Sequence, residues 1–543
     1  MQPVPSAAPQ RAPPLPAAAA AAASSSRRAA DVAVVGGSLQ AYAAAYLLAK
    51  RGKRTVLVEH AALQLAGVTP SARPDVALHL PAASSHAVSA ATEAFALWRG
   101  IEASAEGARG LLHLCGSIDV APVRGSSAAS DALGAMQDAS RAASLQFGML
   151  SPDEVSAAFP RLRPPKGSAA LYTNAGGVVN GRLAAAVLRA MAQRAGAVLA
   201  PACLLGWRDA GGHFALRTAP LEAAAAADGL GGEGEVVYEC EQLVLLPDAA
   251  VQQQSLGLFG LAVPGAQLWR LPAGRWRAQE DCAALPLWQL LGAGSTRTVD
   301  DPTAIDSAWG IPVLGWAPGS MFVAQCLPDG SPAENLAAGV AAGAAGGGGG
   351  SSTPGSQLPT SGGPDELAAA AAAALGSAGA AAALQLGALG EERPGSEEAV
   401  DAERQWQAER QRQEEAAARR LATAGALAGR LVNGVGSRLA GLDSQMRLIV
   451  TPDSEPAVGS HPGFEDGRVV AAFPATAAQL GCLPGDQLAP LIARLAADEL
   501  MGRAPQAVSA AAVALGREAL AAEAAALPHD SWFELARCLP AQL

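Results

Sequence analysis

The chain has 543 residues, a formal net charge of −11 and 4% aromatic residues. This length suffices for two domains, and the acidic balance disfavours general nucleic-acid binding, which needs clustered Lys and Arg. No apolar run reaches the roughly 18 residues of a membrane span, and the seven cysteines form no CxxC pair, which fits a reducing compartment better than a disulfide framework.

Residues 1–30 are rich in Ala, Pro and Ser and contain Arg11, Arg27 and Arg28 without an acidic residue. This composition is typical of an organellar transit peptide, for a plastid or mitochondrion, and equally of a disordered tail. The last three residues, Ala541-Gln542-Leu543, weakly resemble the peroxisomal Ser-Lys-Leu signal but lack its Lys. Organellar, peroxisomal and cytoplasmic locations therefore all stay open.

A βαβ pattern begins at Asp31. An apolar run, Val32–Val35, leads through a Gly-Gly-Ser turn into an Ala-rich helical stretch, Leu39–Arg51. A second apolar run, Thr55–Val58, ends at the acidic Glu59. This order of elements predicts a dinucleotide-binding unit in which the turn receives the diphosphate.

The glycine fingerprint of this unit is altered. Gly36 holds the first position and is followed by Gly37, while Ser38 and Ala41 take the second and third positions of G-x-G-x-x-G. Ala is tolerated at the third position, whereas the Cβ of Ser38 lies where the diphosphate would press. Glu59 suits a carboxylate that accepts hydrogen bonds from an adenosine ribose. The alternative is a βαβ unit that keeps its fold and binds nothing.

Farther along the chain, the pattern predicts an amphipathic helix at Leu183–Arg194 and strands at Ala197–Leu199, Phe214–Arg217 and Gln242–Leu246. Together with the first unit, they indicate a doubly wound α/β sheet plus a second domain. A Gly/Ser/Pro- and Ala-rich segment, 335–396, is predicted to be a disordered insertion. The charged stretch that follows predicts an exposed helix, with a partner-binding coiled coil as the alternative.

Several segments in a fixed order resemble the FAD-dependent D-amino-acid oxidase superfamily, and within it the sarcosine oxidase and glycine oxidase branch. Besides 31–59, they are Thr92–Trp98, Leu114–Ile118, Leu150–Pro160, Ala170–Gly177, Trp309–Gly315, Thr451–Ala472 and Ala489–Leu500. The resemblance implies an FAD-binding Rossmann-type domain interleaved with a mixed-sheet substrate domain. The two parts would span 31–334 and 397–502, followed by a C-terminal helical extension at 503–543.

The resemblance also implies chemistry, in which a small amine or amino acid is oxidised by FAD and O2 reoxidises the flavin. Met446 stands where sarcosine oxidases tether FAD through a Cys, so FAD is expected to bind non-covalently. Gln487 stands at the position of the family's Lys beside the flavin, and Arg73 is expected to keep the role of a flavin-facing Arg. A His of the family falls near Cys326.

Two stretches expected to touch the cofactor also lack the family's glycines. They are Leu246-Pro247-Asp248-Ala249 and Pro474–Ala478. A Gln cannot supply the charge with which a Lys activates O2, and side chains in place of glycines crowd a cofactor. The resemblance implies an FAD-dependent oxidoreductase, and no metal site is expected. The losses together favour weakened or absent oxidase activity. The alternative is a degenerate homologue, catalytically weak or inactive, that serves as a binding or scaffolding protein.

Overall fold

The computed structural model describes residues 28–59, 75–122, 128–220, 236–246, 261–262, 267–278, 285–291, 313–316, 321–326, 432, 435–450, 456–464, 466–473, 485–503, 523–524 and 533–534. The predicted insertion at 335–396, the charged stretch after it and residues 1–27 lie outside the described residues. In the part of the chain that the structure describes, no helix has the length and apolar character needed to cross a membrane.

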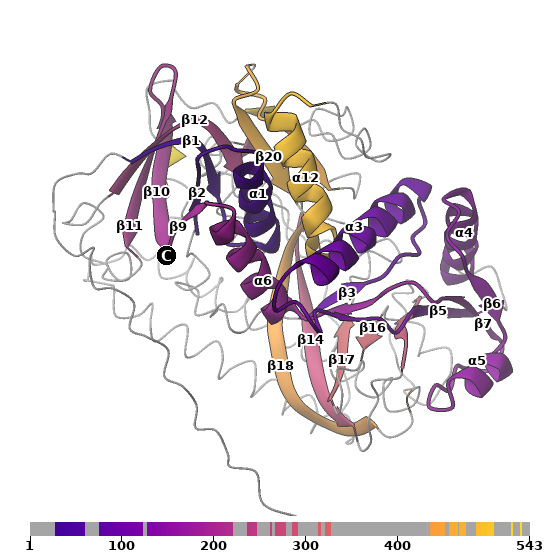
Figure 1. Ribbon diagram of the computed structural model, residues 1–543. Coiled ribbons are helices and arrows are strands. Elements are labelled where there is room, and N and C mark those ends of the chain that lie inside the picture. Colours follow the sequence, from indigo (N-terminus) through magenta and orange to yellow (C-terminus); the bar gives the residue numbers. More distant parts are fainter. Residues whose placement is uncertain are drawn as a thin grey trace, which may run out of the picture.

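The first sheet contains the predicted βαβ unit (Figure 1). Its parallel strands lie in the order β9-β2-β1-β12. The far edge of β12 pairs antiparallel with β11 and, farther along, parallel with β20. The bounds are β1 (Arg28–Val35), β2 (Thr55–Val58), β9 (Val198–Ala200), β10 (Ala202–Asp209), β11 (Phe214–Pro220), β12 (Val236–Leu245), β19 (Ala457–Ser460), β20 (Val469–Phe473) and β22 (Phe533–Glu534).

Helices cover one face of this sheet. They are α1 (Leu39–Lys50), α6 (Gly181–Arg194) and α12 (Ala489–Leu500), the last preceded by the 3₁₀ turn η5 (Gly485–Leu488). Helix α3 (Ser85–Ser104) packs against α12 and η5. Their Ala, Leu and Val side chains form a buried core with alternate residues of the strands. Because so many of these residues are small, α1 packs closely against both α6 and α12. The other face of the sheet forms a second core that includes Trp207 and Phe214 from the antiparallel strands.

Helices α1 and α12 run in the same direction. At the end of α1, the guanidinium of Arg51 donates to Asp498 Oδ1 at 2.6 Å, in the last turn of α12. Since the helices pack side by side, their first turns also lie at one end. That end is the carboxyl edge of the parallel strands, because α1 begins directly after β1. This edge is where ligands bind in open α/β sheets.

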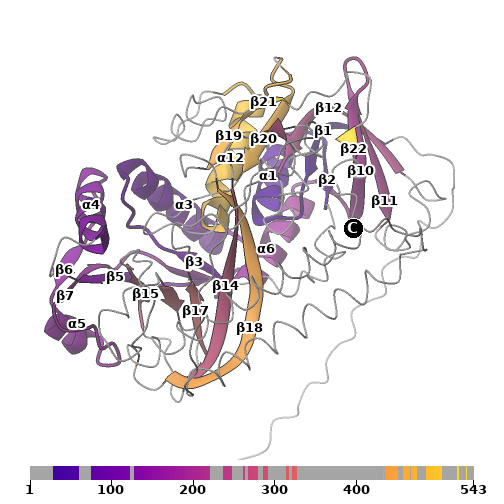
Figure 2. The ribbon, with the colours of Figure 1, turned by 180° about the vertical axis from the view of Figure 1, so that it is seen from behind.

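The second sheet is mixed, in the order β18-β14-β17-β16-β15-β5-β7-β6. Only the β15–β5 pair is parallel. Figure 2 shows β14 and β18 side by side at one edge of the mixed sheet, running from close to α12 to the lower part of the view. The bounds are β5 (Ser117–Pro122), β6 (Gly148–Leu150), β7 (Ser168–Thr173), β14 (Gln267–Ala278), β15 (Leu287–Leu290), β16 (Val313–Trp316), β17 (Met321–Cys326) and β18 (Val435–Val450), with helices α4 (Ala128–Ala142) and α5 (Pro152–Ala158).

Two smaller sheets complete the described structure. One joins β3 (Val76–Leu78), β8 (Gly177–Val179) and β4 (Leu112–His113), and the other pairs β13 (Leu261–Ala262) with β21 (Glu523–Ala524). The predicted class, α/β with a Rossmann-type sheet combined with a mixed sheet, is confirmed.

Two boundaries differ from the sequence prediction. Strand β1 starts at Arg28, because residues 28–30 pair with 238–240 of β12, so the strand includes the last three residues of the predicted tail. The extension after residue 502 is not helical where it is described. Phe533 and Glu534 pair instead with Trp207 and Gly206 of β10, so pairing with a distant strand overrides the local helical pattern.

Candidate functional site

The turn after β1 is held between two neighbouring strands. The Gly36 N–H donates to Val58 O at 3.0 Å, and the Leu246 N–H donates to Val35 O at 2.9 Å. Gly36 has φ +148°, and a Cβ at this residue would lie 2.0 Å from the carbonyl oxygen of Leu246. Only glycine fits this conformation and this space. The first position of the fingerprint is therefore required by the backbone itself.

Ser38 is the N-cap of α1. Its backbone is extended, and its hydroxyl accepts a hydrogen bond from the Ala41 N–H at 3.2 Å. Ser38 is 1% exposed, and Gly37 beside it is also buried. Ala41 is fully buried, with its Cβ close to the turn at Gly36. The two departures from the glycine fingerprint thus have local roles, as a helix cap and as a small packing residue.

Gln40 is the most informative residue of this turn. Its side chain is 1% exposed, yet neither Nε2 nor Oε1 has a hydrogen-bond partner among the described residues. The N–H groups of the first helical turn also lack partners within α1, and this turn contains no acidic residue. Leaving a buried polar group unpaired costs about 1–3 kcal/mol. These residues therefore fit a polar, anionic group such as a diphosphate at the start of α1.

Glu59 follows β2 directly, and its N–H donates to Ala200 O at 2.9 Å. Its carboxylate lies at the sheet edge where a ribose would be bound, but it is already engaged. Arg189 of α6 donates from Nε to Oε1 at 2.7 Å and from Nη2 to Oε2 at 3.1 Å. The hydrogen bond with Glu59 raises the pKa of Arg189.

Gln487 lies in η5, immediately before α12, and is fully buried. Its Nε2 donates to His79 O at 2.6 Å, while the His79 N–H donates to its Oε1 at 3.4 Å. The indole N–H of Trp98 in α3 donates to the main-chain carbonyl of Gln487 at 2.9 Å. The side chain predicted at the family's Lys position thus joins the segment after β3 to the start of α12.

The sequence prediction missed a buried pair next to Gln487. His79 Nε2 lies 2.6 Å from Oδ1 of Asp119 on β5, and both side chains are fully buried. Burial raises the pKa of Asp119, and the interaction with His79 opposes that rise. The available signal was polar residues inside apolar runs, Leu-His-Leu and Ile-Asp-Val. The pair connects the mixed sheet to the segment after β3, whose residues Val76 and Leu78 belong to the core of the helix-covered sheet.

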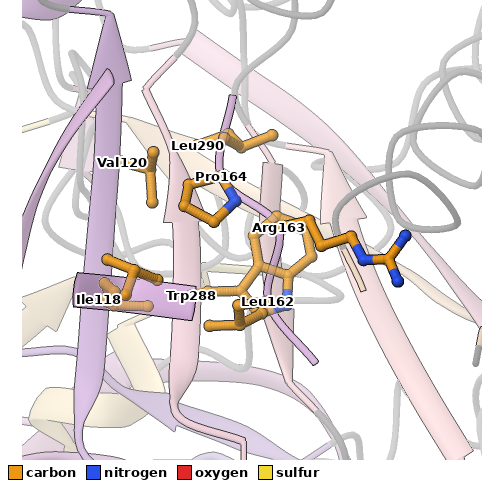
Figure 3. A pocket seen from close by; sticks show the side chains of 8 residues that line it. Ile118, Val120, Leu162, Arg163, Pro164, Trp288 and Leu290 are labelled. Atoms are coloured by element: carbon orange, nitrogen blue, oxygen red, sulfur yellow. The ribbon is translucent and has the colours of Figure 1, made fainter. Parts of the chain in front are cut away.

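The opposite face of β5 carries a small apolar pocket (Figure 3). Neighbouring residues of a strand point to opposite faces, so Ile118 lines this pocket while Asp119 does not. The cavity measures about 20 Å³, room for about one water molecule, and it cannot hold a substrate or a flavin. Its lining consists of Ile118, Val120, Val155, Leu162, Arg163, Pro164, Trp288 and Leu290.

Other predicted positions contribute less. Arg73 and the stretches 247–249 and 474–478 lie outside the described residues. Met446 lies on β18 opposite Leu271 of β14, and Cys326 lies on β17 opposite Val313. The functional roles assigned to these residues, and to Gln487, stay predictions. Among the residues that the structure describes, no group of three or more His, Cys, Asp or Glu could hold a metal ion.

The turn, the parallel sheet and the mixed sheet together define a dinucleotide-binding oxidoreductase fold. Residues 31–237 match the family model DAO, FAD dependent oxidoreductase. This match covers less than half of the chain and agrees with the resemblance in the sequence. No curated protein matches the chain.

Solved structures share the fold at low identity. NikD, an unusual amino acid oxidase essential for nikkomycin biosynthesis, has a TM-score of 0.56 and 15% identity, over 88% of this chain and 95% of its own. Glycine oxidase from Geobacillus kaustophilus has a TM-score of 0.52 and 17% identity, over 90% and 99%. L-amino acid deaminase from Proteus vulgaris has a TM-score of 0.51 and 13% identity, over 91% and 98%. At these identities the likeness establishes the fold alone.

Proposed function

We propose that this protein binds FAD non-covalently and uses it to oxidise a small amine or amino acid. The observation that carries the proposal is the start of α1, where Gln40 has a buried amide without a partner in the described structure. It lies within residues 31–237, which match the FAD dependent oxidoreductase model. FAD, when bound, supplies the acceptor for a hydride from the substrate.

In this proposal, different residues at the carboxyl edge of the sheet bind different parts of FAD. The unpaired N–H groups of the first turn of α1 attract the diphosphate, and Gln40 adds an amide that can donate to it. Gly36 keeps the turn tight against β12. Glu59 accepts from the adenosine ribose once its carboxylate is free of Arg189.

Non-covalent binding is supported by the state of the described thiols. Burial raises the pKa of Cys203 to about 11 and that of Cys240 to about 12. Burial also raises the pKa of Cys115. Thiols with such pKa values are protonated at neutral pH and are poor nucleophiles. Met446, at the place of the family's tethering Cys, has no thiol with which to form a covalent link.

An amine or amino acid is the substrate class that the comparisons favour. NikD is an amino acid oxidase, and glycine oxidase acts on an amino acid as well, as their names state.

The acceptor that reoxidises FAD is a separate question. Gln487 is neutral, and both ends of its amide bond the main chain of His79. It cannot supply the positive charge that favours reduction of O2, so O2 and a dye must both be tried as acceptors.

The test begins with the visible spectrum of the purified protein, before and after incubation with FAD. We expect flavin absorption bands that bleach anaerobically with at least one member of a panel of small amines and amino acids. Acid precipitation should leave the flavin in the supernatant. A colourless protein that takes up no FAD would refute the proposal and leave the scaffolding homologue. Flavin that stays with the precipitate would refute non-covalent binding alone.

A further inference from the structure

Arg189 occupies the edge of the Glu59 carboxylate that a ribose would need. Its guanidinium donates through Nε and Nη2 to both carboxylate oxygens, at 2.7 and 3.1 Å. Such a two-pronged, charge-assisted arrangement is among the stronger ion-pair geometries in proteins. The guanidinium approaches the carboxylate from the side on which both oxygens can accept hydrogen bonds at once.

A ribose diol approaches a carboxylate in the same way. Its two neighbouring hydroxyl groups donate to the two oxygens and therefore need the same outward edge of Glu59. The guanidinium and the diol cannot both make their paired contacts at once. We infer that Arg189 competes with the adenosine ribose of FAD for Glu59, so that cofactor binding requires Arg189 to swing away. The inference rests on the proposed binding of FAD.

The exposure of the two side chains makes this exchange feasible without unfolding. The Arg189 side chain is 43% exposed, whereas that of Glu59 is 11% exposed. Glu59 is also held by its N–H, which donates to Ala200 O of β9. Arg189 can therefore turn into water and remain hydrated, while Glu59 stays at the sheet edge. Arg189 thus lowers the affinity for FAD by the free energy of the contacts that it gives up.

The test compares FAD affinity in three full-length proteins: wild type, Arg189→Met and Arg194→Met. Met keeps the length and the apolar stem of Arg without its charge. Arg194 lies on the same helix and pairs with Glu106 at 2.9 Å, away from Glu59. Quenching of flavin fluorescence on binding gives the dissociation constant. We expect about tenfold tighter FAD binding for Arg189→Met, about the strength of one good ionic hydrogen bond, and no change for Arg194→Met.

A second ligand separates the ribose effect from a general change of the site. FMN lacks the adenosine, so the three proteins should not differ in their affinity for it. If thermal unfolding shows that Arg189→Met does not fold, the FAD affinity of Arg189→Lys tests the inference instead. Lys presents a point charge instead of a fork, so its FAD affinity should exceed that of wild type by a smaller factor.

Two results overturn the inference in distinguishable ways. If wild type binds FAD and Arg189→Met binds it equally or more weakly, Arg189 supports the site and the competition is refuted, while the proposed function stands. If Arg189→Met does not fold, FAD binding by Arg189→Lys that is equal to or weaker than that of wild type refutes the competition in the same way. If none of the proteins binds FAD at any concentration tried, the proposed function fails together with the inference.

Discussion

Two buried glutamines stand at the starts of two parallel, adjacent helices, and their surroundings are opposite. Gln40 begins α1 with neither end of its amide paired in the described structure. Gln487 precedes α12 with both ends bonded to the main chain of His79. Both are at most 1% exposed. The same side chain therefore has a protein partner at one helix and lacks it at the other.

This difference separates the start of α1, where we propose that a ligand binds, from the start of α12, which links two parts of the fold. The start of α1 combines N–H groups that have no partner within the helix with the unpaired amide of Gln40, whose burial is unfavourable until a polar group binds. The start of α12 instead ties η5 to His79, and His79 ties to Asp119 on the mixed sheet. Gln487, which the sequence predicts at the position of the family's Lys, is a structural link among the described residues of this chain.

The most damaging change at the first helix is expected from Gly36→Ala. The new Cβ would lie 2.0 Å from the Leu246 carbonyl oxygen, at φ +148°. We expect a loss of at least about 3 kcal/mol in the free energy of unfolding, with loss of FAD binding. Gly52→Ala is the matched control, because Gly52 has φ +87° with no atom within 4 Å, and should cost only about 1 kcal/mol. Equal losses in urea denaturation would contradict the steric argument.

The two glutamines give the direct comparison. Gln487→Leu should lower the free energy of unfolding by about 2 kcal/mol, because it leaves the buried N–H and carbonyl of His79 without their partners. Gln40→Leu removes an amide that is already unpaired, so it should cost nothing or stabilise slightly. It should nevertheless weaken FAD binding. A large stability loss for Gln40→Leu would mean that the amide is satisfied by the protein in solution.

The buried His79–Asp119 pair next to Gln487 predicts that the free energy of unfolding depends on pH. Because burial raises the pKa of Asp119 above the ordinary carboxyl value, folding favours its protonated form. That stability is present below the ordinary pKa of about 3.8 and is lost as the pH rises through the raised value. Asp119→Asn keeps an acceptor for His79 without titrating. The wild type should therefore lose stability relative to Asp119→Asn as the pH rises.

Urea denaturation of both proteins from pH 4 to pH 8 measures this difference. His86→Ala serves as a histidine control, since His86 is exposed on α3 and should change stability by less than about 0.5 kcal/mol. A difference between wild type and Asp119→Asn that does not vary with pH would contradict the assigned direction of the shift.

The features that could be predicted from the sequence are those set by residues close together in the chain. The bounds of β2 were predicted as observed, and those of α1 to within one residue. Both depend on signals within the segment, which are hydrophobic periodicity and Gly52, at φ +87°, directly after the C-cap of α1. The first three residues of β1 were missed, since Arg28-Ala29-Ala30 carries no apolar signal and is a strand only through pairing with β12. Family and fold were recognised from the order of many such local segments.

The site itself depends on contacts that sequence spacing does not show. Arg189 lies 130 residues after Glu59 and reaches it only because α6 leads into β9, the neighbour of β2. Gln487 meets His79 across 408 residues. The sequence therefore indicated the residue types of a nucleotide site but not which of them the protein itself engages. The helical prediction for the C-terminal extension was wrong at 533–534 for the same reason, a distant strand partner.

The smallest expected effect tests the altered fingerprint itself. Ser38→Gly places a glycine at the second position and removes the Cβ that is expected to press on the diphosphate, so it should tighten FAD binding by a few fold. It also removes the hydroxyl that accepts from Ala41, but Gly is a tolerable N-cap, so the expected loss of stability is only a few tenths of a kcal/mol. Ser84→Gly, at the N-cap of α3, loses a similar cap outside the candidate site and serves as the control. If FAD affinity is unchanged in Ser38→Gly, the Ser38 side chain does not crowd the cofactor. The departure at the second position is then only the capping of α1, and any weakness of the site must arise at Glu59 instead.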